Sequence, residues 1–339
     1  MGTDEPEQSA SSGVGAVLVT GGAGYIGSHT VLELSDAGCE VVVIDDFSNG
    51  DIAAIPSSVA VYRGNVADVP LVRQVIRRHD VRLVMHFAGS VSLAESFERP
   101  LDYVRNNTEA SRFLATTCVE AGVRRFIFSS SAAVYGGAMS TPFREIDVAA
   151  PLTPYGVSKL DTEILLRELS ASYPGFEAVS LRYFNVAGAD PAGRVGRRGW
   201  GGGLIDRAID AALGPDTALD IWGNDYDTRD GAGERDYIHV SDVAAIHLAA
   251  MRYLEAGGCS VVLNCGSGRG HTVLEVLAAL EAIIGRPIPR RSGPRRNGDV
   301  PIAIGDVARL AATLGWRPRY DDLSLILRSA LAWRGWAET

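Results

Sequence analysis

A tyrosine and a lysine in this sequence have the spacing that proton transfer requires. Tyr155 precedes Lys159 by four residues, and Lys159 is the only lysine in the 339 residues of the chain. Residues four apart lie on one face of a helix, where an ammonium favours the ionised form of a phenol. The planar guanidinium of arginine does not replace a lysine in a crowded polar site. The two residues are therefore a candidate acid–base pair.

Ser131 ends a run of three serines and is the third candidate. We expect its hydroxyl to hydrogen-bond a substrate oxygen while Tyr155 takes or gives a proton and Lys159 stabilises the phenolate. The alternative interpretation makes Tyr155 a half-buried helix residue and Ser131 a loop hydroxyl. A second signal in the chain has to decide between the two.

A glycine-rich turn supplies that signal. Residues 21–27 read GGAGYIG, which places G-x-G-x-x-G between an expected strand and an expected helix. Glycines there let a pyrophosphate approach the backbone at the N-terminus of a helix. Asp45 ends the next strand, where its carboxylate can accept hydrogen bonds from ribose hydroxyls, and Asp46 would repel a 2′-phosphate. The sequence therefore predicts NAD as cofactor, although an ordinary strand-to-helix turn is the alternative.

Such a cofactor would change the acidity of the candidate tyrosine. Lowering the pKa of Tyr155 from about 10 to about 7 requires roughly 4 kcal/mol. We expect the Lys159 ammonium and a cationic nicotinamide to supply this together in a cleft of low dielectric constant. Tyr155 would then act as acid and base near neutral pH.

The first half of the chain has the elements to position these groups. Short apolar runs, which predict strands, lie at 16–21, 40–45, 59–64, 82–88, 124–131 and 176–184. Helices are expected between them at 25–37, 71–79, 101–120 and 154–172. This alternation predicts an α/β fold with a doubly wound parallel (Rossmann) sheet, in which Ser131 ends a strand at the ligand crevice.

The second half is less regular and predicts a smaller, C-terminal, substrate-binding α/β domain. We expect loops at 193–203, 223–233 and 286–296, a helix at 241–254 capped by Ser241, and a strand at 261–264. The predicted division is a disordered tail at 1–13, a dinucleotide-binding domain at 14–184, and a mainly substrate-binding domain at 185–339. Residues 240–265 are expected to pack back on the dinucleotide-binding domain.

Composition excludes several classes of function. The net charge of −9 argues against nucleic acid or an anionic membrane as partner. The four cysteines lie far apart without C-x-x-C spacing, so no metal site is expected and the thiols indicate a reducing, cytoplasmic location. The sequence contains no signal peptide pattern and no apolar stretch long enough for a membrane span.

Longer motifs carry a resemblance that covers nearly the whole chain after the tail. They are GGAGYIGSHT at 21–30, HFAG at 86–89, RRFIFSSSAAVYG at 124–136, PYGVSKL at 154–160, RYFNVAGADP at 182–191, WGNDYDTRDGAGERDYIHVSD at 222–242 and RRNGDVP at 295–301. With these motifs the chain resembles the UDP-galactose 4-epimerases, a family of extended short-chain dehydrogenase/reductases. The last two motifs are the specific ones, because they lie in the expected substrate domain.

The resemblance implies a reaction, partners and site residues. Tyr155 would abstract the proton of the sugar 4-hydroxyl while NAD takes the hydride of C4. The 4-keto sugar would then rotate about the diphosphate linkage and receive the hydride on its other face. UDP-galactose and UDP-glucose would be the substrates. Relatives of this kind form homodimers, for which the helices at 101–120 and 154–172 are the candidates. NAD would contact Gly21, Gly24, Tyr25, Ile26, Gly27, Asp45, Asp46, Phe47, Ser48, Asn49, Gly50, Asn65, Val66, Phe87, Ala88, Gly89, Asn106, Tyr155, Lys159 and Phe184. The UDP-sugar would contact Ser131, Tyr155, Asn185, Leu204, Arg235, Arg296, Asp299 and Ala303.

The chain departs from the family pattern at Val91, at Asn65 and at Gly202-Gly203-Leu204, and the last run lacks the polar side chain that usually precedes the leucine and contacts UDP. Ala303 bears on the substrate as well. Val91 stands where some relatives carry a lysine toward the cofactor, so one cationic contact is lost. Asn65 replaces an aspartate, and its amide oxygen is expected to accept the hydrogen bond of the adenine amino group. Ala303 stands where the family places a residue that gates bulky groups at C2. Its small side chain makes UDP-N-acetylglucosamine a candidate second substrate.

Other reactions on the same scaffold are alternatives. A nucleotide-sugar 4,6-dehydratase needs an acid beside the serine, but Ala132 and Ala133 stand there. A 4-epimerase of another nucleotide sugar, such as a UDP-pentose or a UDP-uronate, is a further alternative, although no cation for a uronate can be placed. A non-catalytic NAD-binding protein is the third, and it would not require Lys159 to be kept.

Overall fold

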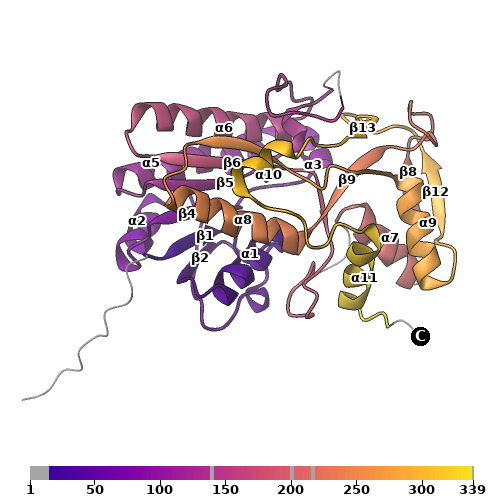
Figure 1. Cartoon of the computed structure of the whole chain (residues 1–339), viewed down its shortest axis with the longest axis horizontal. Coiled ribbons are helices and arrows are strands. Elements are labelled where there is room, and N and C mark those ends of the chain that lie inside the picture. The colour runs from indigo at the N-terminus through magenta and orange to yellow at the C-terminus, as the bar shows by residue number, and fades with distance from the viewer. Residues whose placement is uncertain (1–14, 138–140, 199–201, 215–217, 338–339) are drawn as a thin grey trace, which may run out of the picture.

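The computed structural model describes residues 15–137, 141–198, 202–214 and 218–337. The predicted tail at 1–13 and part of the predicted loop at 193–203 lie outside the described residues. Figure 1 shows a large sheet with helices on both of its faces and a smaller part beside it.

The large sheet is parallel throughout and has the strand order β10-β6-β5-β4-β1-β2-β3. Its strands are β1 (Val17–Thr20), β2 (Val41–Asp45), β3 (Ala60–Arg63), β4 (Leu83–His86), β5 (Arg125–Ser131), β6 (Glu177–Tyr183) and β10 (Val261–Cys265). The inner strands consist mostly of buried Val, Ile and Leu, because helices cover both faces. The chain order reverses between β1 and β4, and this reversal opens a crevice at the carboxyl edge of the sheet. The predicted doubly wound fold is confirmed.

Two layers of helices cover this sheet. One layer contains α1 (Tyr25–Asp36), α8 (Val240–Glu255) and α10 (Ala308–Leu314), and the other contains α2 (Val69–Arg78), α5 (Ala110–Glu120) and α6 (Pro154–Ser172). Shorter elements are η1 (Ile52–Ala54), α3 (Leu93–Glu98), α4 (Pro100–Tyr103), the π-helical η2 (Val104–Glu109) and η3 (Ala132–Val134). The single helix predicted at 101–120 is therefore three consecutive helical segments. The predicted cap of α8 was wrong, because the His239 ring accepts a hydrogen bond from the backbone N–H of Ser241.

The smaller part has its own sheet and core. Strand β9 (Glu234–His239) pairs with β7 (Asn185–Ala187), β11 (Gly270–Thr272) and β13 (Ile302–Ala303), and β8 (Leu219–Trp222) pairs with β12 (Arg290–Gly293). Helices α7 (Leu204–Leu213), α9 (Val273–Ile284) and α11 (Leu323–Trp333) pack against these strands around a third apolar cluster. Helix α9 begins with a capping box of Thr272 and Glu275 and ends at Gly285 in the left-handed conformation. None of the helices in the described ranges has the length and apolar character to cross a membrane.

Candidate active site

The glycine turn joins β1 to α1 and has the shape of an anion cradle. Gly21 has a φ of 69°, and a Cβ on Gly27 would lie 2.2 Å from the Gly21 carbonyl oxygen. Around Gly24, by contrast, the nearest atom to an added Cβ is 3.3 Å away. Gly24 begins α1 without a side-chain cap, so the first N–H groups of the helix remain available to a phosphate. These residues fit a dinucleotide pyrophosphate.

Asp45, at the end of β2, holds this turn together. Its two carboxylate oxygens accept hydrogen bonds from the backbone N–H of Ala23 at 2.9 Å and of Phe47 at 2.8 Å. Each oxygen keeps a second lone pair, which can accept a ribose hydroxyl. The backbone then turns sharply at Phe47, whose φ is 60°. Asp45 thus fixes the glycine turn and also offers a carboxylate to a ribose.

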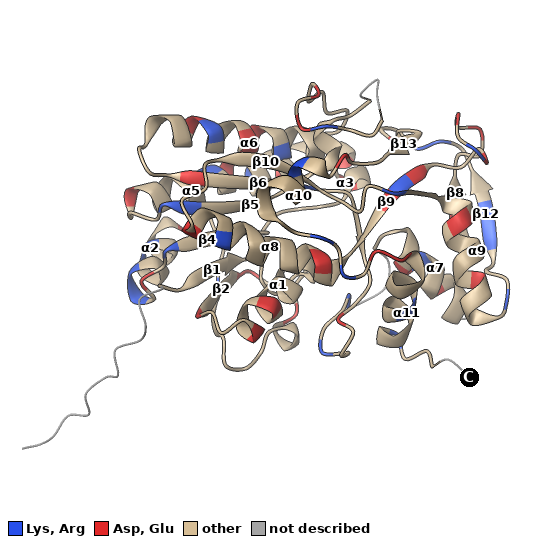
Figure 2. Ribbon diagram, viewed as in Figure 1, with Lys and Arg blue, Asp and Glu red and all other residues tan. Residues whose placement is uncertain are grey.

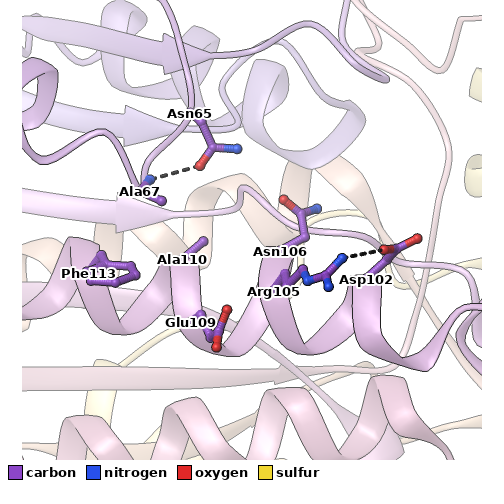
Figure 3. A pocket seen from close by; sticks show the side chains of 8 residues that line it. All are labelled: Asn65, Ala67, Asp102, Arg105, Asn106, Glu109, Ala110 and Phe113. Atoms are coloured by element: carbon purple, nitrogen blue, oxygen red, sulfur yellow. Dashed lines mark hydrogen bonds and ion pairs between the residues drawn. The ribbon is translucent and has the colours of Figure 1, made fainter.

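A pocket of about 390 Å³ lies between the segment that follows β3 and the helical segments α4, η2 and α5. Asn65 and Asn106 line it from opposite sides, together with Arg105 and Phe113 (Figure 3). The Asn65 amide oxygen accepts a hydrogen bond from the Ala67 N–H at 2.8 Å. The expected bond from an adenine amino group to this oxygen therefore has a competitor, and the amide nitrogen of Asn65 is the free group.

The remaining residues predicted to contact NAD lie mostly in the segments that follow β2, β3 and β4. They are Asp46, Ser48, Asn49, Gly50, Val66, Phe87, Ala88 and Gly89, with Tyr25 and Ile26 in the first turn of α1. Phe184 follows β6, and its ring packs against Phe143 with 6.5 Å between the ring centroids. Phe184 is thus also part of a small aromatic cluster beneath the site.

The proton-transfer candidates meet where β5 ends and α6 begins. Thr153 caps α6 by accepting a hydrogen bond from the Gly156 N–H at 3.0 Å, which fixes the first turn that carries Tyr155. Tyr155 is 9% exposed, and its burial raises the pKa of its phenol, whereas the neighbouring Ser131 side chain lowers it. The structure therefore places the Ser131 side chain near the Tyr155 phenol.

Lys159 lies one turn farther along α6 and is 3% exposed. Its ammonium donates a hydrogen bond to the Ser129 carbonyl oxygen at 2.8 Å and lies 5.7 Å from the centroid of the Tyr155 ring. Burial lowers the pKa of Lys159 to about 8, and the Glu163 carboxylate opposes this shift. The protein's own side chains do not produce the expected fall in the Tyr155 pKa, because the effect of burial outweighs that of Ser131.

Glu163, one turn after Lys159 on α6, forms a buried ion pair with Arg182 that was not predicted from the sequence. Glu163 receives two hydrogen bonds from the Arg182 guanidinium, at 2.9 and 2.6 Å, and a third from the Ser130 hydroxyl. The side chains of Glu163 and Arg182 are only 5% and 6% exposed. The four-residue spacing from Lys159 to Glu163 places both on one face of α6 and could have indicated this.

The residues predicted to hold the UDP-sugar gather in the smaller part. Asp299 lies 3.1 Å from Arg296 and 3.9 Å from Arg235, and the Arg296 guanidinium stands 5.9 Å from the centroid of the Trp222 ring. Figure 2 shows the arginine of β9 between two acidic residues and a basic stretch on β12. In the strand register Ala303 lies opposite Arg235 and Asn185 lies opposite Tyr237, while Leu204 is the first residue of α7.

Arg207, on the first turn of α7, is a further cation that sequence reasoning missed. Its Nε atom is buried and makes no hydrogen bond within the part of the chain that the structure describes. Burial and the nearby charge of Arg296 lower its pKa, and Asp220 and Asp299 oppose this shift. Its position three residues after Leu204, on the same helical face, was the available signal.

Comparisons with known proteins agree with this geometry. A model of the NAD dependent epimerase/dehydratase family matches residues 17–266. The chain belongs to this family. It is 49% identical over 318 residues, 94% of this chain and 91% of the relative, to a UDP-glucose 4-epimerase of Azospirillum brasilense. The matched range includes the glycine turn and all three proton-transfer candidates.

Two solved structures show how far the likeness extends. The UDP-glucose 4-epimerase from Bifidobacterium longum in complex with NAD⁺ and UDP has a TM-score of 0.88 and 36% identity, with coverage of 94% of this chain and 98% of that one. The UDP-Glc/GlcNAc 4-epimerase from Campylobacter jejuni has a TM-score of 0.83 and 39% identity, with coverage of 95% and 99%. Family members therefore share both parts of this fold.

Proposed function

We propose that the protein interconverts UDP-galactose and UDP-glucose by inverting C4 of the sugar, with bound NAD as cofactor. The observation that carries this is the buried Tyr155, which lies near Ser131 at the carboxyl edge of the sheet, with the buried ammonium of Lys159 5.7 Å from the centroid of its ring. The same edge carries the anion cradle at the glycine turn. The 49% identity to a UDP-glucose 4-epimerase supports this substrate pair.

Each residue of the proton-transfer group then has a defined task. Tyr155 takes the proton of the sugar 4-hydroxyl and returns it when the carbonyl is reduced, and the Ser131 hydroxyl orients that oxygen. Lys159 places a positive charge beside the phenol and so stabilises its ionised form. NAD, when bound, supplies the hydride acceptor and donor at C4, with no net redox change. Gly24, Asp45 and the segments after β2 to β4 would hold it.

The arginines of the smaller part would bind the nucleoside diphosphate. Arg235 and Arg296 offer bidentate donors to phosphate oxygens, and Asp299 lies within ion-pair distance of both guanidinium groups. Asn185 and Leu204 lie on elements that adjoin this cluster. UDP-galactose and UDP-glucose share these contacts, so the sugar can turn while its nucleotide stays bound.

The decisive experiment measures UDP-glucose formation from UDP-galactose by the purified protein without added NAD. We expect turnover, because the hydride returns to the sugar and the cofactor is regenerated. If no product forms even with NAD supplied, the proposal is wrong. If NAD binds but no nucleotide sugar reacts, the protein is a non-catalytic NAD-binding protein.

Ala303 is the residue that favours a second substrate, UDP-N-acetylglucosamine. It lies opposite Arg235 in the register of β13 and β9, and it packs beside the cluster of Val134, Tyr135 and Phe143. An Ala303→Tyr variant should lose activity on the N-acetylated sugar and keep it on UDP-galactose. Equal effects on both sugars would rule out gating at this position.

A homodimer is the proposed assembly. Apolar side chains remain exposed along α3, η2 and the start of α6, including Phe97, Val104, Leu152 and Val157 at 44% to 53%. They surround a hollow of about 440 Å³ between these helices. A second copy of this face would cover them. Light scattering should give twice the chain mass for the wild type and a lower mass for the Val104→Asp variant.

The cytoplasmic location stays a prediction.

A further inference from the structure

The segment 188–198, called the arginine strap below, follows β7 and lies between α1 and α11 (Figure 1). Three of its residues are arginines, and each pairs with a carboxylate on a different element. Arg194 binds Asp36 of α1, Arg197 binds Asp206 of α7, and Arg198 binds Asp51 after β2. None of these arginines belongs to the sites described above.

Arg198 fastens the loop that follows β2. Its guanidinium lies 2.9 Å from the Asp51 carboxylate and donates to the Ala53 carbonyl oxygen at 3.3 Å. The Asp51 N–H in turn donates to the Ala23 carbonyl oxygen of the glycine turn at 3.2 Å. Asp45 holds the other end of the same loop through the Ala23 N–H. The loop 46–50, proposed to contact NAD, is therefore fixed at both ends against the glycine turn.

Arg197 joins the strap to both halves of the molecule. Its guanidinium carbon lies 4.1 Å from the centroid of the Tyr25 ring, and the Tyr25 hydroxyl donates to the Gly188 carbonyl oxygen at 2.6 Å. On the other side its Nε atom is 2.9 Å from the Asp206 carboxylate, and its carbonyl oxygen accepts a hydrogen bond from the Trp333 indole at 2.7 Å. The strap thus crosses from the first turn of α1 to the smaller part.

We propose that Arg197 and Arg198 are positioning residues that hold Tyr25 and the loop 46–50 around the dinucleotide and so slow its release. The inference rests on the proposed binding of NAD. For the nucleotide to leave, the loop has to move away from the glycine turn, and the bond from Arg198 to Asp51 opposes that movement. The side chains of this pair are 42% and 43% exposed, so salt should weaken it. The pair of Arg197 and Asp206, at 29% and 12%, should be less sensitive.

The test measures how fast the holoprotein loses NAD. Wild type, Arg198→Gln and Arg197→Gln are diluted into buffer without NAD, and the bound cofactor is quantified over time at low and high salt. We expect release about fivefold faster in Arg198→Gln, as suits an exposed ion pair, and a larger acceleration in Arg197→Gln. The matched control is Arg290→Gln, whose guanidinium forms a 3.3 Å ion pair with Glu281 and is 41% exposed, away from the cofactor loop.

A charge exchange separates positioning from general stability. The double variant Arg198→Asp with Asp51→Arg should restore slow release, and the melting temperatures of the NAD-free proteins should change little. Release at the wild-type rate in both single variants, or equal acceleration in Arg290→Gln, would overturn the inference. A wild-type protein that binds no NAD under any condition would instead overturn the proposed function.

Discussion

The two ends of the candidate site are built in opposite ways. Around Tyr155 the polar groups are buried and hydrogen-bonded inside the protein, with Lys159 on the Ser129 carbonyl oxygen and Glu163 paired with Arg182. Around Asp299 the arginine side chains are more exposed, with Arg296 at 45% and Arg235 at 17%, and their ion pairs with Asp299 span 3.1 and 3.9 Å. The first end lies in the core of the parallel sheet, and the second lies on loops and short strands.

This difference suggests how each end responds to change. A buried polar group depends on a few fixed partners, so its loss leaves another group unpaired in a low dielectric. An exposed arginine exchanges its partners for water at little cost. The proton-transfer end should therefore respond strongly to small changes in geometry, and the arginine end mainly to changes in charge and salt.

The largest effect should come from exchanging arginine and lysine at the two ends. Lys159→Arg keeps the charge but cannot place it beside Tyr155, so we expect turnover to fall by a factor of about 100 to 10,000 with the fold retained. The reciprocal Arg235→Lys should raise KM for UDP-galactose about tenfold and leave kcat nearly unchanged. Steady-state kinetics with circular dichroism measure both. Near-normal activity of Lys159→Arg would mean that the lone lysine reflects compositional drift.

Breaking the buried pair behind Lys159 should have the next largest effect. Glu163→Gln leaves the Arg182 charge uncompensated in the core, which should lower the free energy of unfolding by about 3–5 kcal/mol. Urea unfolding measures this. The control replaces both partners, Glu163→Leu with Arg182→Met, and should be more stable than the single variant. If the double variant is the less stable of the two, the pair is not the source of the effect.

Features that depend on neighbouring residues in the sequence could be predicted better than contacts between residues that only the fold brings together. Apolar periodicity and glycine spacing follow from the local chain, so the parallel sheet, the glycine turn and the helix of Tyr155 could be predicted from the sequence. The partner of Glu163 is Arg182, on a neighbouring strand, and only the fold brings them together. The cap of α8 failed similarly, because a histidine ring took the role expected of serine.

The pH dependence of stability should separate the effect of charge from that of burial at Lys159. Burial lowers its pKa to about 8 from 10.5, so the folded protein binds fewer protons than the unfolded chain between these values. Stability should then rise with pH across this window by up to about 3 kcal/mol relative to Lys159→Met. Activity should fall over the same window, because the ammonium is lost. Urea unfolding of both proteins at pH 8 and above measures the difference, and parallel curves would contradict it.

The smallest effect on ligand binding should come from replacing Arg207, which has a buried Nε atom although it lies among the arginines of the smaller part. Its Nε is buried without a partner among the described side chains, beside Arg296 and Asp299. Its guanidinium is only partly compensated by Asp220 and Asp299, so an anionic ligand should bind it, and Arg207→Gln should weaken UDP binding about tenfold. Calorimetry with UDP and with uridine locates the contact, because only UDP binding should change if the guanidinium meets phosphate. Arg290→Gln is again the control. Equal weakening for uridine would place Arg207 at the nucleoside, and no change in UDP binding would place this arginine outside the site.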